Sequence, residues 1–389
     1  MSADAGAELG AELGAELCAA LFTALTRSDQ RRKGELYVRG LLSAGGRKSI
    51  RNIAARVGDR AAEQSLHHFI SCSTWDWNLV RAALARHLEE TLRPRAWVAH
   101  SVVIPKTGHH TVGVRRRFVP SMGQVVNSQQ AFGLWAANDA VSVPVTWQLM
   151  LSGDGPECVA EGAREVRDWV GEPVRPVVLD LPDADPVAAA ARFEAAGLPF
   201  LMSVRGETLV TADAPDLLGG GGREFTADRL LRTVRTLRRP VTWRDPESAA
   251  VRTSWVAAVP VRLPGARRPV LLLGEWDGPG TRPVRCWLTG MVTEPWGRLL
   301  RLTRLTRRVA LDFAAVSAPV GMVDFEGRSF EGWHRHTTLA SVAHAVRAAE
   351  GTPAGARWSS PRLLREEDHR LPERGRELGG GAQPEARPA

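Results

Sequence analysis

The sequence has little lysine, few cysteines and no long apolar run. Only three of its 51 basic residues are lysines, so arginine carries almost all of the positive charge. The four cysteines are far apart and form no Cys-x-x-Cys pair. This spacing argues against a zinc site or a disulfide framework and favours reduced thiols. No apolar segment approaches the roughly 18 residues of a membrane span, and the acidic N-terminus lacks the basic and apolar regions of a secretory signal. We therefore expect a cytoplasmic protein without membrane association.

Carboxylates are absent from one long internal stretch. Between Glu90 and Asp139 the sequence has no Asp or Glu. It has six basic residues there: Arg93, Arg95, Lys106, Arg115, Arg116 and Arg117. Such a stretch attracts phosphate and repels Mg²⁺, and the planar guanidinium of arginine can donate two parallel hydrogen bonds to a phosphate. Together with a net charge of +8, this indicates a polyanionic partner. A GC-rich genome would also enrich arginine, without any functional cause.

Helical periodicity covers the segment from about 16 to 93, where apolar residues recur every three or four positions. A short basic helix is expected within Arg47–Asp59, ending at Gly58, and a second one over Ala61–Ser71. Two short helices joined by a glycine turn could form a helix-turn-helix that binds the DNA major groove. A plain helical bundle with solvated arginines is the alternative. The candidate DNA-contacting residues are Arg47, Lys48, Arg51 and Arg56.

From Trp97 the pattern changes to alternating strands and helices. Strands are expected at 97–104, 111–119, 125–136 and 141–151, followed by a helix at 156–170, a strand at 176–180, a helix at 185–196 and a strand at 198–204. Asp185 is placed to cap the second helix. This order predicts an α/β core with a mixed sheet. After a basic segment at 223–240, three more strands (255–263, 269–276, 283–289) and two helices (296–316 and one ending at 349) are expected.

Several segments in this order resemble the transposases of the insertion sequence 701 type. The segments are Tyr37-Val38-Arg39-Gly40-Leu41-Leu42-Ser43, Arg47-Lys48-Ser49-Ile50, Pro105-Lys106-Thr107-Gly108, Thr111-Val112-Gly113-Val114, Met122-Gly123-Gln124-Val125-Val126-Asn127-Ser128-Gln129 and the stretch from Phe325 to Leu339. The resemblance covers about 30–349. It implies an α/β fold of the DDE superfamily, in which a ribonuclease-H-like mixed sheet core carries a mostly β insertion and follows an all-α DNA-binding region.

The composition and the resemblance together predict a division into domains. These are a low-complexity N-terminus at 1–15, a helical, DNA-binding domain at 16–93, the first part of the core at 94–205, an insertion with further strands at 206–295, the C-terminal helices of the core at 296–350 and a disordered tail at 351–389.

The family chemistry is metal-dependent DNA cleavage and joining, in which three carboxylates hold two Mg²⁺ ions about 4 Å apart. By alignment of the flanking segments, the first acidic positions fall on His100 and Ser101. The second acid is retained as Asp180, at the end of a predicted strand. The third falls on Ala310. Two of the three acids are therefore replaced, and the sequence predicts no metal site, no cofactor and no cleavage of DNA.

Other basic and aromatic residues remain as candidate contacts to DNA. Lys106, Arg115, Arg116 and Arg117 belong to the stretch without carboxylates, where alternate side chains of a strand point in opposite directions. A second group follows the third acidic position and consists of Arg328, Trp333, Arg335 and His336. Its functional interpretation is contact with phosphate near the former active site, and the alternative is structural support of a helix.

Three functions are compatible with these residues. The first is a nuclease-dead DNA-binding regulator, associated with the nucleoid, with double-stranded DNA as partner and a possible homodimer. The second is an active transposase with the unusual metal ligands His100, Asp180 and Asp312. The third is a non-catalytic partner or inhibitor of an active transposase. A relic without function is a further alternative.

Overall fold

The computed structural model describes residues 14–58, 60–119, 122–151, 155–213, 223–266 and 268–350. The low-complexity start, apart from its last two residues, and the tail expected to be disordered at 351–389 lie outside the described residues. Within those ranges no helix is long and apolar enough to span a bilayer.

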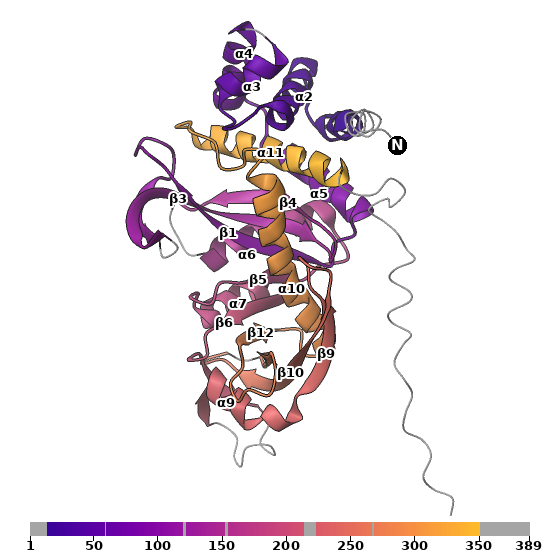
Figure 1. The fold of residues 1–389 in the computed structure, drawn as a ribbon, viewed down its shortest axis with the longest axis vertical. Helices are drawn as coiled ribbons and strands as arrows, with labels where there is room; N and C mark the ends of the chain where they lie inside the picture. Colours follow the sequence, from indigo (N-terminus) through magenta and orange to yellow (C-terminus); the bar gives the residue numbers. More distant parts are fainter. Residues whose placement is uncertain are drawn as a thin grey trace, which may run out of the picture.

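Three helices, α2 (Ser28–Ser43), α3 (Ile50–Val57) and α4 (Arg60–Ser71), pack together at the N-terminal end of the molecule (Figure 1). The next helix, α5 (Trp77–Thr91), packs against the core. The Ser49 hydroxyl caps α3 by accepting a hydrogen bond from the Asn52 N–H, which satisfies one of the free donors of the first turn. Gly58 ends α3, as predicted from the sequence. The basic helix is thus a separate, defined element.

The core sheet has the strand order of the ribonuclease H fold. Its strands are β1 (Ala96–Pro105), β2 (Arg115–Val119), β3 (Gln124–Ala137), β4 (Ser142–Leu149), β5 (Val177–Leu179) and β6 (Phe200–Val204). Strands β4, β3 and β1 are antiparallel neighbours, whereas β1, β5 and β6 run parallel, in the order β4-β3-β1-β5-β6. This mixed sheet confirms the predicted fold class.

Two helices connect the parallel strands, α6 (Gly155–Val170) and α7 (Pro186–Ala195). The carboxylate of Asp185 accepts hydrogen bonds from the N–H groups of Val187 and Ala188 at the start of α7. The predicted helix cap is therefore confirmed. Both helices turn a buried stripe toward the sheet. Strand β5 ends beside the middle of β1, where Ala99 is opposite Leu179.

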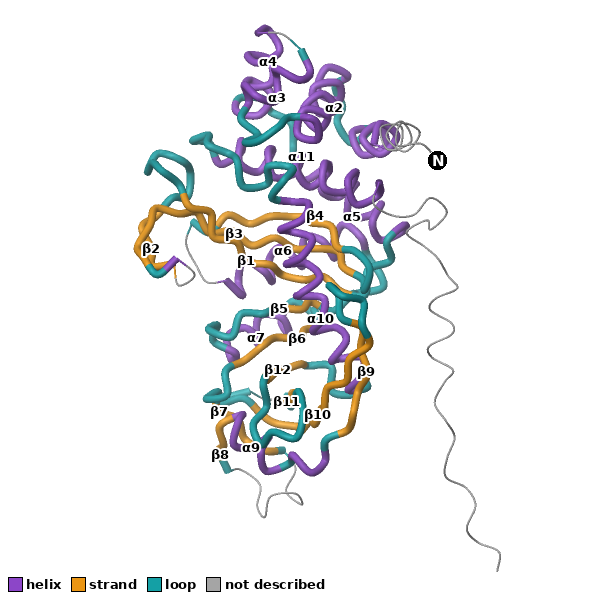
Figure 2. Tube along the Cα trace, in the orientation of Figure 1, coloured by secondary structure: helices purple, strands orange, loops and turns teal. Residues whose placement is uncertain are grey.

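The insertion continues the core sheet. It contains β7 (Leu209–Ala212), β8 (Glu224–Thr226), α9 (Ala227–Thr233), β9 (Arg239–Arg244), β10 (Val251–Arg262), β11 (Val270–Trp276) and β12 (Arg285–Thr289). Because β12 pairs with β6, one sheet of 12 strands in the described part of the chain runs through core and insertion (Figure 2). The basic segment 223–240, to which the sequence assigned no structure, contains β8, α9 and the start of β9.

Two C-terminal helices complete the core. α10 (Trp296–Asp312) crosses from the insertion to the core sheet, and α11 (Phe330–Glu350) lies between that sheet and the N-terminal helices (Figure 1). The predicted helix at 296–316 ends in π-helical geometry at Phe313–Ser317. Side chains of α11 are buried on all sides of the helix, so α11 joins the two parts of the molecule.

Candidate functional site

The aligned acidic positions meet where β1, β5 and α10 come together. In the parallel pairing of β1 with β5, Ala99 is opposite Leu179, so the next residues along the two strands are His100 and Asp180. The ring of Phe313, at the end of α10, lies 5.1 Å from the ring of His100. Ala310 is one turn earlier on the same side of that helix. Three positions from distant parts of the sequence are thereby brought to one edge of the sheet.

His100 lies among aromatic rings. Besides Phe313, the edge of Trp135 approaches its ring at 6.1 Å between centroids. Burial lowers the pKa of His100 to about 4, so the imidazole is neutral at pH 7. The neighbouring Ser101 alternates to the other face of the strand. His100 therefore fills space between the sheet and α10, at a position to which the resemblance assigned a carboxylate.

Asp180 retains its carboxylate, but a guanidinium lies beside it. Its Oδ2 is 3.8 Å from Nη1 of Arg285 on β12, and its side chain is 42% exposed. The described residues contain no group of three or more His, Cys, Asp or Glu side chains that could hold a metal. Mg²⁺ prefers several oxygen ligands in octahedral geometry. One carboxylate next to an arginine and a neutral imidazole does not fit the Mg²⁺ pair that the family resemblance implies.

Asp312 is engaged inside the protein. Its Oδ2 accepts hydrogen bonds from the backbone N–H of Ser142 at 2.8 Å and from the Ser142 hydroxyl at 2.7 Å. Its Oδ1 accepts a bond from Arg308 at 2.6 Å. These contacts tie α10 to β4 and use both oxygens. They leave Asp312 a structural residue, which removes it from the set of unusual ligands considered with His100 and Asp180.

The basic candidates of the N-terminal region separate into two groups. Arg51 and Arg56 are exposed on α3, and Arg47 is exposed while pairing with Glu326 at 2.6 Å. Lys48, in contrast, is buried. Its ammonium donates to the carbonyl of Ala44, and its backbone N–H donates to Asp324 at 2.7 Å. In this conformation the side chain of Lys48 is therefore engaged within the protein, and its contact with DNA stays a prediction.

Lys106 is likewise turned inward. Its Nζ donates to the carbonyl oxygens of Val323 at 3.1 Å and Phe325 at 2.7 Å. Partial burial lowers its pKa to about 8. The side chain connects the end of β1 to the loop before α11, so its hydrogen bonds are used within the protein rather than on a phosphate.

The three consecutive arginines of β2 alternate as expected for a strand. Arg115 and Arg116 are exposed, whereas Arg117 is partly buried. Arg117 donates to the side-chain oxygen of Gln130, and Arg115 donates to the carbonyl of Leu151. Arg116 therefore remains as the outward-facing cation of this strand.

The group after α10 supports α11, which was the structural alternative. Arg328 is exposed, but Trp333, Arg335 and His336 are buried. Arg335 donates to the carbonyl of Ile70 at 3.0 Å. His336 is bonded to the Tyr37 hydroxyl at 2.9 Å and to the carbonyl of Gly321 at 2.8 Å. Arg335 and His336 thus join α11 to the N-terminal helices, and all three side chains are buried in this conformation, where they support α11.

Comparison with known proteins identifies the family. The model of the DDE superfamily endonucleases matches residues 20–262, which is more than half of the chain. The chain belongs to the DDE superfamily endonuclease family. The match includes His100 and Asp180 and ends before α10. No curated protein matches the sequence significantly.

Among solved structures, this DDE superfamily chain is similar to the piggyBac transposase in a cryo-EM structure of its synaptic complex with hairpin DNA. The TM-score is 0.39 and the sequence identity 12%, over 91% of this chain and 78% of the other.

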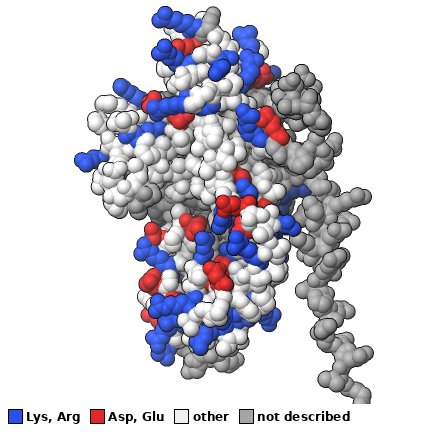
Figure 3. All heavy atoms as spheres, viewed as in Figure 1, with Lys and Arg blue, Asp and Glu red and all other residues white. Residues whose placement is uncertain are grey.

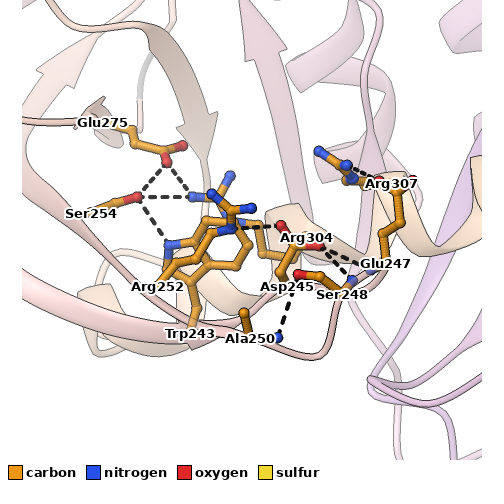
Figure 4. Close-up of polar contacts among 10 residues, drawn as sticks. All are labelled: Trp243, Asp245, Glu247, Ser248, Ala250, Arg252, Ser254, Glu275, Arg304 and Arg307. Atoms are coloured by element: carbon orange, nitrogen blue, oxygen red, sulfur yellow. Dashed lines mark hydrogen bonds and ion pairs between the residues drawn. The ribbon is translucent and has the colours of Figure 1, made fainter.

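A buried ion pair that the sequence did not reveal fixes α10 to the insertion (Figure 4). Arg304 of α10 donates to the carboxylate of Glu275 on β11 and lies 3.9 Å from the ring centroid of Trp243. The hydroxyl of Ser254 donates to the same carboxylate at 2.8 Å. In this DDE superfamily chain the helix with the third acidic position is thus held from the insertion side. Spacing in the sequence gives no signal for such a pair, because its members are 29 residues apart on different elements.

Proposed function

We propose that this chain is a DNA-binding protein of the DDE superfamily that does not cleave DNA and acts as a regulator at specific sites in the nucleoid. The observation that carries the proposal is the composition of the edge where β1, β5 and α10 meet. His100 and Ala310 occupy two acidic positions, and Arg285 lies beside the retained Asp180. A two-metal mechanism requires carboxylates at that edge.

Binding to DNA is supported by the exposed arginines and by the family. Figure 3 shows Lys and Arg side chains gathered over the N-terminal helices and again over the insertion. Arg51 and Arg56 extend from α3, which is joined to α4 through Gly58 in the manner of a helix-turn-helix. Arginines on an exposed helix can contact phosphates and guanine edges. Double-stranded DNA is the partner proposed, and a homodimer would match a palindromic site.

The first experiment is a selection of fragmented genomic DNA by the purified protein at about 0.15 M salt, a physiological ionic strength, with sequencing of the retained fragments. Recovery of a discrete site supports the proposal. Uniform recovery or none contradicts a site-specific regulator and favours a protein partner, such as an inhibitor of an active transposase. The salt concentration matters because contacts with phosphate alone bind any sequence and weaken steeply with salt.

The second experiment measures nicking of supercoiled plasmid with Mg²⁺ or Mn²⁺. We expect no nicking above that of the Asp180→Asn variant, which serves as the matched control because only the carboxylate is removed. Nicking that is present in the natural protein and lost in Asp180→Asn would overturn the proposed loss of cleavage and restore the active transposase.

A further inference from the structure

Strands β2 and β3 form a hairpin that extends beyond the core sheet (Figures 1 and 2). Their pairing runs from Arg115 opposite Ser128 to Val119 opposite Gln124. β1 ends opposite that same Ser128, at Pro105. Past this point β3 pairs with β2 alone among the described strands. The hairpin is therefore a two-stranded ribbon with two faces of its own.

One face of the ribbon is attached to the body of the protein. Arg115, Arg117 and Val119 alternate onto it. Arg115 is bonded to the carbonyl of Leu151, Arg117 is bonded to the side chain of Gln130, and Val119 is buried. These contacts set the direction in which the ribbon points.

The opposite face is free and carries apolar side chains in solvent. Phe118 is 61% exposed, and its cross-strand partner Val125 is 53% exposed. Arg116 and its partner Asn127 lie on the same face. Arg116 makes no hydrogen bond or ion pair with the described residues. Aromatic and β-branched pairs across two strands usually contribute stability by packing in a core. Here the pair is presented outward beside a cation.

This free face is a continuation of the sheet face that carries His100. The register of β3 with β1 proceeds without a shift from His100 opposite Gly133 to Ile104 opposite Gln129. Odd-numbered residues of β3 therefore share one face, which includes Asn127 and Val125. Between His100 and the ribbon this face is covered by the protein itself, since Val102, Ile104 and Gln129 are buried, so the face opens to solvent at the ribbon.

We propose that the β2–β3 hairpin is a wedge that inserts Phe118 and Val125 between base pairs of a DNA duplex lying along this face, while Arg116 contacts an adjacent phosphate. Apolar side chains that enter a base step unstack and kink the duplex, at a cost of a few kcal/mol that added contacts offset. A two-stranded ribbon is narrow enough for a groove of DNA. The cation beside the apolar pair favours a polyanion over a second protein surface. This inference rests on the proposed function, since it names how the same DNA is held.

The test separates binding from unstacking. A short duplex with fluorescein at one end and 2-aminopurine at a central position reports binding by anisotropy and unstacking by the rise in 2-aminopurine fluorescence. We expect the natural protein to produce both signals. Phe118→Ser and Val125→Ser should bind the duplex several-fold more weakly at most and lose the fluorescence rise. Val251→Ser is the matched control, because Val251 is 70% exposed on β10 and outside the ribbon.

Each outcome has a defined meaning. Binding without a fluorescence rise, or a rise that persists in both ribbon variants, overturns the wedge and leaves the proposed function intact. Absence of binding to any duplex overturns the proposed function together with the wedge. If sedimentation shows a dimer that Phe118→Ser converts to a monomer, the free face is a contact between two copies and the wedge is wrong.

Discussion

The guanidinium of Arg81 lies 3.0 Å from Nδ1 of His334, and both side chains are buried between α5 and α11. Arg81 also donates to the hydroxyls of Thr338 at 2.8 Å and Thr146 at 3.1 Å. Every hydrogen-bond partner of this guanidinium is an uncharged group, and burial lowers the pKa of Arg81 to about 9. One arginine thereby connects the N-terminal helices, the core sheet and the last helix.

Removal of this side chain should destabilise the whole molecule. Arg81→Ala leaves a cavity and several buried polar atoms without partners, and we expect a loss of about 3 kcal/mol in the free energy of unfolding. Urea unfolding followed by circular dichroism measures it. Arg86→Ala, on the exposed side of α5, is the control and should cost less than about 1 kcal/mol. Equal effects of the two substitutions would contradict a connecting role for Arg81.

Stability should decrease in mild acid because of buried histidines. Burial lowers the pKa of His336 and His344 to about 4 and that of His334 to about 2. In the unfolded chain a histidine titrates near 6.5, so the unfolded state binds more protons below that pH. Stability is therefore complete above about pH 6.5 and falls as the pH is lowered toward 4, by at most about 1.4 kcal/mol per pH unit for each histidine.

The slope of the urea midpoint against pH, between 6.5 and 4.5, tests this dependence. His344→Gln should reduce the slope, since one proton-binding difference is removed. His109→Gln, exposed in the loop before β2, should leave it unchanged. A midpoint that does not vary with pH in the natural protein would exclude the mechanism.

Loss of one partner of the ion pair between Arg304 and Glu275 (Figure 4) should destabilise the protein more than loss of both. Glu275→Ala leaves the guanidinium of Arg304, which is 13% exposed, without its carboxylate, and we expect a loss of about 3 kcal/mol. Replacement of both partners, Glu275→Leu with Arg304→Met, should cost less than either single change because no buried charge remains. The free energies of unfolding of the two single variants and the double variant measure this interaction. If the losses of the single variants add up to that of the double variant, the two residues do not interact.

Arg51 and Arg56 should each contribute to the salt dependence of DNA binding. Each contact with a phosphate adds about 0.9 to the slope of log K against log salt concentration. Arg51→Ala and Arg56→Ala should therefore reduce the slope by about that amount, as measured by anisotropy over a salt series. Arg298→Ala, whose exposed guanidinium is already paired with Glu294 on the same helix, is the control. A slope unchanged in both α3 variants would exclude α3 from the interface.

Much of the fold followed from local signals in the sequence. The cap at Asp185, the helix end at Gly58 and the buried strand at 97–104 depend on short-range features, and each appears where it was predicted. The short elements at 223–240 were missed. Strand β8 pairs with the preceding strand β7 and β9 with the following strand β10, but β9 alternates between partly buried and exposed residues without an apolar side.

The positions of the candidate site came from the family resemblance, which assigned His100, Asp180 and Ala310 to the acidic positions. The parallel pairing of β1 with β5 makes His100, in the middle of β1, a neighbour of Asp180 at the end of β5. The cations of Lys48 and Arg335 were expected at the surface because charged side chains usually lie there. In the structure both side chains donate hydrogen bonds to backbone carbonyl oxygens, Lys48 to that of Ala44 and Arg335 to that of Ile70. Because every residue has a backbone carbonyl, the pattern of residue types in the sequence cannot show which one will accept.

The pairing of β12 with β6 has a consequence for any attempt to shorten this protein. A cassette can be excised from a fold when its removal exposes only loops, but deletion of 206–295 would leave β6 with a bare row of N–H and C=O groups. The same deletion would remove Glu275 and leave the buried guanidinium of Arg304 in α10 without its carboxylate partner. The remaining chain should therefore associate edge to edge and precipitate, so that the smallest soluble unit retains the insertion even if every contact with DNA lies elsewhere.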